Sequence, residues 1–108
     1  MSKEIPVYSS SGNVFADLGF ADADDMRLRA DLVHELREII TRRKLTQQAA
    51  ADLLGIRQPD LSALLRGRLT KYSLERLLRF MTVLDRDVEI VVKAKARNRP
   101  ARITLAVT

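Results

Sequence analysis

Cysteine and tryptophan are both absent from this chain of 108 residues. Without thiols the chain can form neither a disulfide nor a thiolate metal site, and a reducing cytoplasm is compatible with that. No apolar run is long enough to span a bilayer, and the first residues lack the apolar core of a signal peptide. We therefore expect a cytoplasmic protein that does not contact membranes.

Residues suited to catalysis or metal binding are also scarce. His34 is the only histidine and lies beside an apolar stripe, so we expect a structural role for it. Asp22, Asp24 and Asp25 lack the spacing of a calcium loop and suit the first turn of a helix. No glycine loop for phosphates and no serine in a nucleophile motif is present. The sequence predicts a protein that is not an enzyme and holds neither a cofactor nor a metal.

The charge is unevenly distributed along the chain. Residues 1–35 carry three basic and seven acidic side chains, whereas residues 36–108 carry sixteen basic and seven acidic ones. The net charges of the two parts are therefore −4 and +9. A basic majority favours a polyanionic partner, and a merely soluble surface is the alternative explanation.

Two longer segments have the period of amphipathic helices. Apolar residues recur at helical spacing over residues 26–40, after the acids at 22–25. Cations follow at 42–44, where the negative end of the helix dipole favours them. Ser73 can cap a further helix whose apolar face covers residues 74–81.

Residues 46–68 are the most informative stretch of the chain. They contain two short helical patterns joined by Gly55, which supplies the positive φ that a tight turn requires. Thr46 caps the first pattern, and the second begins near Gln58 with Pro59 in its first turn. Two helices joined in this way allow a small domain to place one helix in the major groove of DNA. The apolar residues expected to face inward are Ala50, Leu53, Leu54, Leu61, Leu64 and Leu65.

The period changes to two after residue 87. Apolar side chains at 88, 90, 92 and 94 predict a strand over residues 88–94, and residues 103–107 can form a second short strand. A lone strand cannot satisfy its own backbone, so residues 88–94 must pair with something. The simplest partner is the same strand of a second copy. Residues 103–107 or 5–7 of the same chain are the alternatives.

The predicted fold class is therefore mainly α. We expect an N-terminal arm over residues 1–21, a domain of four to five helices over 22–84, and a strand with a basic tail over 85–108. The strand is expected to pair across a dimer.

Several residues of the two short helices resemble the λ-repressor-like (XRE-type) helix-turn-helix family. The resemblance covers about residues 30–84 and implies a λ-repressor-like fold that binds double-stranded DNA and regulates transcription. The residues that carry it are Thr46-Gln47, Gly55-Ile56, Gln58, Leu61-Ser62 and Arg66-Gly67-Arg68.

The wider layout is similar to the HigA-type antitoxins of bacterial type II toxin–antitoxin systems. The similarity rests on residues 10–19, 64–68 and 88–92. It implies that the protein binds a ribonuclease toxin of the RelE/HigB kind and represses their shared promoter as a dimer. The expected toxin-binding surface is an acidic and apolar head, which can alternatively pack against the first helix, and its residues are Val14, Phe15, Asp17, Leu18 and Phe20.

Base reading is predicted at the entry of the third helix. At about 100° per residue, the outward stripe of this helix has short apolar side chains at its centre, and in relatives this stripe contacts base edges. Arg57 can therefore reach a guanine, Gln58 an adenine and Asp60 a cytosine amino group, with Ser62 secondary. Gln58 can alternatively hold a phosphate, and the helix dipole also explains Asp60.

Phosphate contacts are predicted where helices begin and where the third helix ends. N–H groups at helix starts attract phosphates, and exposed cations add to them, although those cations can also be merely solvated. The predicted residues are Thr46, Gln47, Arg66, Arg68, Lys71 and Ser73. Because one such motif covers one half-site, a homodimer and an inverted-repeat operator are expected.

The function predicted from the sequence is that of a nucleoid-associated, sequence-specific DNA-binding repressor that also acts as an antitoxin. A free-standing XRE-type regulator without a toxin is the first alternative. A protein or RNA interaction module is the second, but the chain offers only 5% aromatic residues for stacking on bases.

Overall fold

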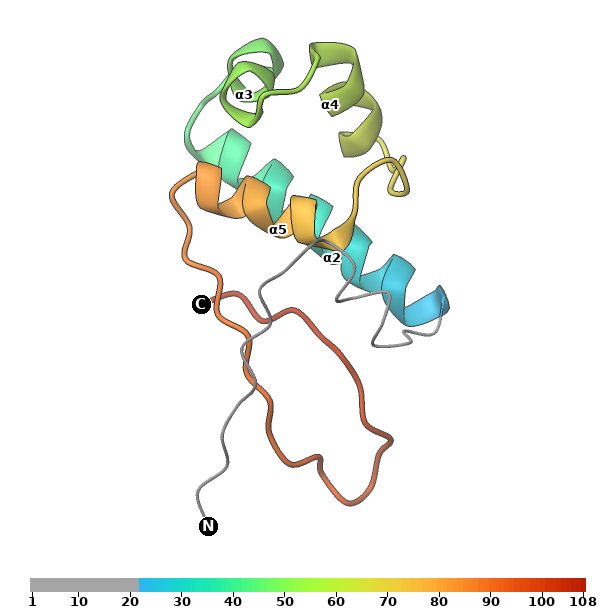
Figure 1. The fold of residues 1–108 in the computed structure, drawn as a ribbon. Helices are drawn as coiled ribbons and strands as arrows, with labels where there is room; N and C mark the ends of the chain where they lie inside the picture. The colour runs from blue at the N-terminus through green and yellow to red at the C-terminus, as the bar shows by residue number, and fades with distance from the viewer. Residues whose placement is uncertain (1–21) are drawn as a thin grey trace.

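Four helices lie in the part of the chain that the computed structural model describes, residues 22–108. They are α2 (Asp22–Arg42), α3 (Gln47–Leu54), α4 (Gln58–Leu65) and α5 (Leu74–Val83). Helix α2, with 21 residues, lies against α5. Helices α3 and α4 form a pair on one side of them (Figure 1). The mainly helical fold is thus confirmed.

Hydroxyl side chains begin two of these helices. The Thr46 Oγ1 atom accepts a hydrogen bond of 3.0 Å from the backbone N–H of Ala49 at the start of α3. The Ser73 Oγ atom accepts one of 3.1 Å from the N–H of Arg76 at the start of α5. Each bond satisfies a backbone donor that has no partner within the helix, which stabilises the helix start. Both predicted caps are confirmed.

Glycines end the two short helices. Gly55 has a φ of 71° and follows α3, and the next residue donates its N–H to the Ala51 carbonyl at 3.1 Å. Gly67 has a φ of 109° and lies just after α4. The left-handed conformation at Gly55 turns the chain sharply, so α4 packs across the domain instead of continuing α3.

A single apolar core joins all four helices. The large side chains that are almost fully buried come from α2, α4, α5 and the residue after α5, and α3 adds the fully buried Ala50 and Ala51. Since each short helix has too few residues to be stable alone, α4 is held by packing against α2 and α3, and α3 by packing against α4 and α5. The largest of these buried side chains are Leu32, Leu36, Ile39, Leu61, Leu64, Leu77 and Leu84.

The prediction that Leu53 faces inward is wrong. Its side chain is 48% exposed, whereas Ala50, Ala51 and Leu54 are buried. Positions three and four apart share a helix face, so a stripe through Ala50, Ala51 and Leu54 turns the residue between them outward.

The strand predicted for residues 88–94 is wrong for the single chain. Residues 86–108 form neither a helix nor a strand, and residues 103–107 do not pair with 88–94. The chain leaves α5, extends away from the helices, turns and comes back in an open loop (Figure 1). Leu105 on the returning half packs against the core, which holds that half apart from residues 88–94. The alternative partner, residues 5–7, lies outside the described residues.

Gly55→Ala should destabilise the protein by about 1–2 kcal/mol, the cost of a left-handed residue with a side chain. A Cβ atom at this position would meet no atom within 4 Å, so the loss would report backbone conformation alone. Gly55→Asn should lose less, because asparagine tolerates this conformation. Chemical denaturation measures both values, and equal stability of Gly55→Ala and the wild type would contradict the expectation.

Candidate nucleic-acid interface

The recognition element of the predicted interface is α4, which has a buried back and an open front. Leu61, Leu64 and Leu65 are buried against the rest of the core. On the other side, Arg57 and Pro59 are exposed at the helix entry. Because the three leucines fix the rotation of the helix, its entry points to solvent.

A side-chain hydrogen bond joins the starts of α3 and α4. The Gln58 Nε2 atom donates to Gln47 Oε1 at 3.0 Å. Gln47 is the first residue of α3 and Gln58 the first residue of α4. The bond fixes the direction of both amides, and it leaves the Gln58 oxygen and the Gln47 NH₂ group available to a ligand. Two predicted site residues are therefore brought together.

Asp60 and Lys71 form an ion pair at the front of α4. The Lys71 Nζ atom lies 2.8 Å from Asp60 Oδ1. The hydrogen bond from Lys71, assisted by the charges of Lys71 and Arg57, holds the pKa of the Asp60 carboxyl below its ordinary value. The sequence predicted a separate DNA contact for each of these two residues. In the structure the two side chains contact each other.

The connection between α4 and α5 is tied to α2 by Arg29. Its Nη1 atom donates to the Leu69 carbonyl at 2.8 Å and to the Tyr72 carbonyl, and its Nε atom lies 3.2 Å from Asp25. Tyr72 is itself buried and stacks edge-on against Phe80 with ring centroids 5.4 Å apart. Arg29 therefore holds in place the loop that carries Lys71 and Ser73.

The remaining predicted phosphate contacts are accessible. Thr46, Arg66, Arg68 and Ser73 are exposed. Thr46 and Ser73 use their hydroxyl oxygens as acceptors in the caps, so each hydroxyl proton can still be donated to a phosphate. Ser62 is only partly exposed on α4.

The basic end of α2 is engaged within the protein. Arg42 forms an ion pair of 3.1 Å with Glu35. Arg43 donates to the Leu84 carbonyl at 3.3 Å and lies 3.9 Å from Asp85. The Arg43 contacts tie α2 to the end of α5, and the Arg42 pair lies within α2, so both arginines are engaged within the protein.

Residues 22–108 hold no group of three metal-ligating side chains. In the same range, no helix combines the length and the apolar character needed to cross a membrane. His34 is exposed on α2.

Comparisons with known proteins agree with this geometry. Residues 14–93 match the model of a family described as a helix-turn-helix domain. A solved chain named as a candidate XRE family transcriptional regulator is 42% identical, with a TM-score of 0.77 over 82% of this chain and 100% of that one. No curated protein matches the chain. The protein belongs to the helix-turn-helix DNA-binding transcription regulators of the XRE family.

Sequence reasoning missed two features of the site. The bond between Gln47 and Gln58 spans eleven positions, and only the folded turn brings the two amides together. Arg29 was counted among the charges of the acidic N-terminal part. The only local signal was Asp25 four residues earlier on the same helix.

Lys71→Ala should raise the pKa of Asp60 toward its ordinary value, because it removes the hydrogen bond and the nearer charge that lower it. An NMR titration of the Asp60 carboxyl measures this value. Arg68→Ala is the matched control, since it removes a positive charge from the same loop without touching Asp60. An unchanged pKa in the Lys71→Ala protein would show that the ion pair does not form in solution.

Proposed function

We propose that the protein is a sequence-specific repressor that inserts the entry of α4 into the major groove of double-stranded DNA. The observation that carries the proposal is the exposed start of α4, with Gln58 oriented by Gln47 and the back of the helix locked into the core. In this proposal Arg57 reads a guanine and Gln58 an adenine, with Ser62 secondary. Asp60 keeps one oxygen beyond its bond to Lys71, and that oxygen can accept from a cytosine amino group.

Phosphates flanking the recognised bases are proposed to bind around this entry. Helix starts offer backbone N–H groups, and the loop after α4 offers exposed cations. Arg29 positions this loop but does not itself touch DNA. The proposed phosphate contacts are Thr46, Gln47, Arg66, Arg68, Lys71 and Ser73.

A homodimer is proposed as the DNA-binding form. One α4 covers one half-site, and a two-fold pair of recognition helices fits half-sites about 34–36 Å apart. The exposed apolar side chains of residues 88–92 support a contact between copies in the C-terminal segment. In this arrangement residues 22–84 bind DNA and residues 85–108 assemble the dimer, on an inverted-repeat operator.

We further propose an antitoxin role, in which the protein also binds a ribonuclease-type toxin and represses the promoter that the two genes share. Its support is the resemblance of residues 10–19, 64–68 and 88–92 to HigA-type antitoxins. The head proposed to bind the toxin lies outside the described residues. Co-expression with an adjacent small basic reading frame, followed by affinity capture, tests this role. If no toxin is captured, the protein is a free-standing regulator.

Replacing Arg57 and Gln58 by alanine should remove selectivity for a duplex that the protein selects from a random pool. Each good base contact contributes about 1–3 kcal/mol, so the double variant should bind this duplex about a hundredfold more weakly or worse. Fluorescence anisotropy with the selected and a scrambled duplex measures the ratio, and circular dichroism checks the fold. Arg27→Ala, which removes an exposed arginine of α2 that is not among the proposed DNA contacts, is the control. Undiminished selectivity in the double variant would refute the assignment of α4.

Affinity for the selected duplex should fall steeply with salt. Six or more phosphate contacts in a dimer predict a loss of about a thousandfold between 50 and 200 mM salt. Arg66→Ala and Arg68→Ala should each reduce the slope of log K against log salt by about 1 per half-site, and Arg27→Ala should not change it. A slope that does not depend on these arginines would place the phosphates elsewhere.

A further inference from the structure

Residues 87–95 form an extended segment with two different faces. Val88, Ile90 and Val92 lie at alternate positions, so they share one face of an extended chain. Ile90 is 69% exposed and Val92 is 85% exposed, although side chains of this kind are usually buried. This segment therefore has an apolar row with no cover from the described part of its own chain.

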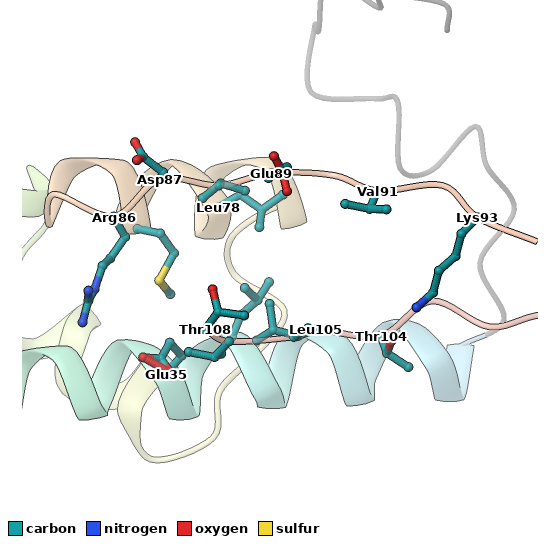
Figure 2. Close-up of a pocket in the computed structure, with 15 residues that line it drawn as sticks. Glu35, Leu78, Arg86, Asp87, Glu89, Val91, Lys93, Thr104, Leu105 and Thr108 are labelled. Carbon is teal, nitrogen blue, oxygen red and sulfur yellow. The ribbon is translucent and has the colours of Figure 1, made fainter. Parts of the chain in front are cut away.

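The backbone of the segment is also without a partner. After the bond from the N–H of Arg86 to the Met81 carbonyl, no backbone hydrogen bond joins residues 87–108 to any other described residue. A cleft of about 460 Å³ separates residues 88–93 from the returning residues 104–108. Figure 2 shows Val91 and Lys93 on one side of this cleft, with Thr104 and Leu105 on the other. An extended edge of this kind is a template for pairing with another chain.

The order of charges selects the direction of that pairing. Asp87 and Glu89 precede Val91, and Lys93 and Lys95 follow it. Parallel pairing of two copies would place like charges opposite each other, which destabilises a sheet. Antiparallel pairing about a two-fold axis places each acid of one copy opposite a lysine of the other.

We propose that two copies of this chain pair through residues 87–95 as antiparallel strands with Val91 on the two-fold axis. In this register Glu89 lies opposite Lys93 of the other copy, and Asp87 opposite Lys95. On the other face Ile90 lies opposite Val92. The proposal specifies the register of the dimer on which the proposed function rests.

Neighbouring registers match the charges less well. With Ile90 on the axis, Asp87 lies opposite Lys93, but Glu89 lies opposite Val91 and has no cation across from it. With Val92 on the axis, Glu89 lies opposite Lys95 and Asp87 opposite Arg97, but Lys93 lies opposite Val91 and has no acid across from it. Residues 103–107 of the same chain carry no charge, so pairing with them would leave both Glu89 and Lys93 without a counterpart.

Disulfide cross-linking tests the register directly, because the chain has no cysteine of its own. A residue on the axis has its Cα about 4.5–5.5 Å from its copy, which is within the range of about 4.4–6.8 Å for disulfides. Val91→Cys should therefore give a covalent dimer under mild oxidation. Ile90→Cys and Val92→Cys are controls at positions at least as exposed as Val91, and each should cross-link poorly alone because its copy lies on the diagonal about 7–8 Å away. An equimolar mixture of these two controls should form the mixed dimer.

Each other outcome of the cross-linking contradicts the proposal. Dominant cross-linking of Ile90→Cys or of Val92→Cys would place the axis at that residue. No cross-linking by any of the three variants would show that the segments do not pair.

Charge reversal tests the ion pairs in the full chain by sedimentation equilibrium. Glu89→Lys and Lys93→Glu should each weaken the dimer about tenfold or more, because each pair occurs twice and becomes repulsive. The double variant, and an equimolar mixture of the two single variants, should recover wild-type association. Asp31→Lys on the exposed surface of α2 is the matched control and should have no effect. A Glu89→Lys protein that dimerises like the wild type would overturn the proposal.

These experiments distinguish a failure of the proposed strand pairing from a failure of the proposed DNA recognition by α4. The cysteine and charge variants leave α4 unaltered, so their binding to a single half-site should equal that of the wild type. Loss of selectivity in the Arg57 and Gln58 variants with unchanged self-association bears only on the proposed function.

Discussion

Burial of one face of α4 is the constraint on which the rest of the structure depends. An eight-residue helix is too short to be stable by itself in water. Leu61, Leu64 and Leu65 bury their side chains among those of the other helices, and this burial supplies most of the stability of the helix. The same contacts decide which residues face solvent. The rotation of α4 about its axis therefore sets both the stability of this helix and the side chains that it exposes.

Polar contacts around α4 then fix the orientation of the side chains at its exposed entry and of the loop beside it. Gln47 orients Gln58, Lys71 pairs with Asp60 and lowers the pKa of its carboxyl, and Arg29 holds the loop that carries Lys71. Each contact joins residues that different elements supply, so the interface forms only when α2, α3 and α4 are packed together. A partner that binds this face encounters a prearranged set of donors and acceptors, which lowers the ordering cost of binding.

The helices and their ends could be predicted from the sequence because their causes are local. Thr46, Ser73 and Gly55 form their capping and turn contacts within three or four residues of their own positions. Leucines spaced by three or four positions mark the buried faces. The Leu53 prediction failed because an eight-residue helix has a narrow buried stripe, which alanines can fill. The bond from Arg29 to residue 69 and the bond between Gln47 and Gln58 depend on the packed turn, which no local pattern describes. The alternation in residues 88–94 indicated an extended segment correctly, but a strand also needs a neighbour that the single chain does not provide.

The central claim is that the leucine-backed α4 presents its entry to duplex DNA. Amide chemical-shift mapping during titration with a duplex selected from a random pool tests it most directly. We expect the largest changes at the starts of α3 and α4 and in residues 66–73, with little change along the middle of α2. Changes concentrated on α2 and α5, with the α4 entry unaffected, would contradict it.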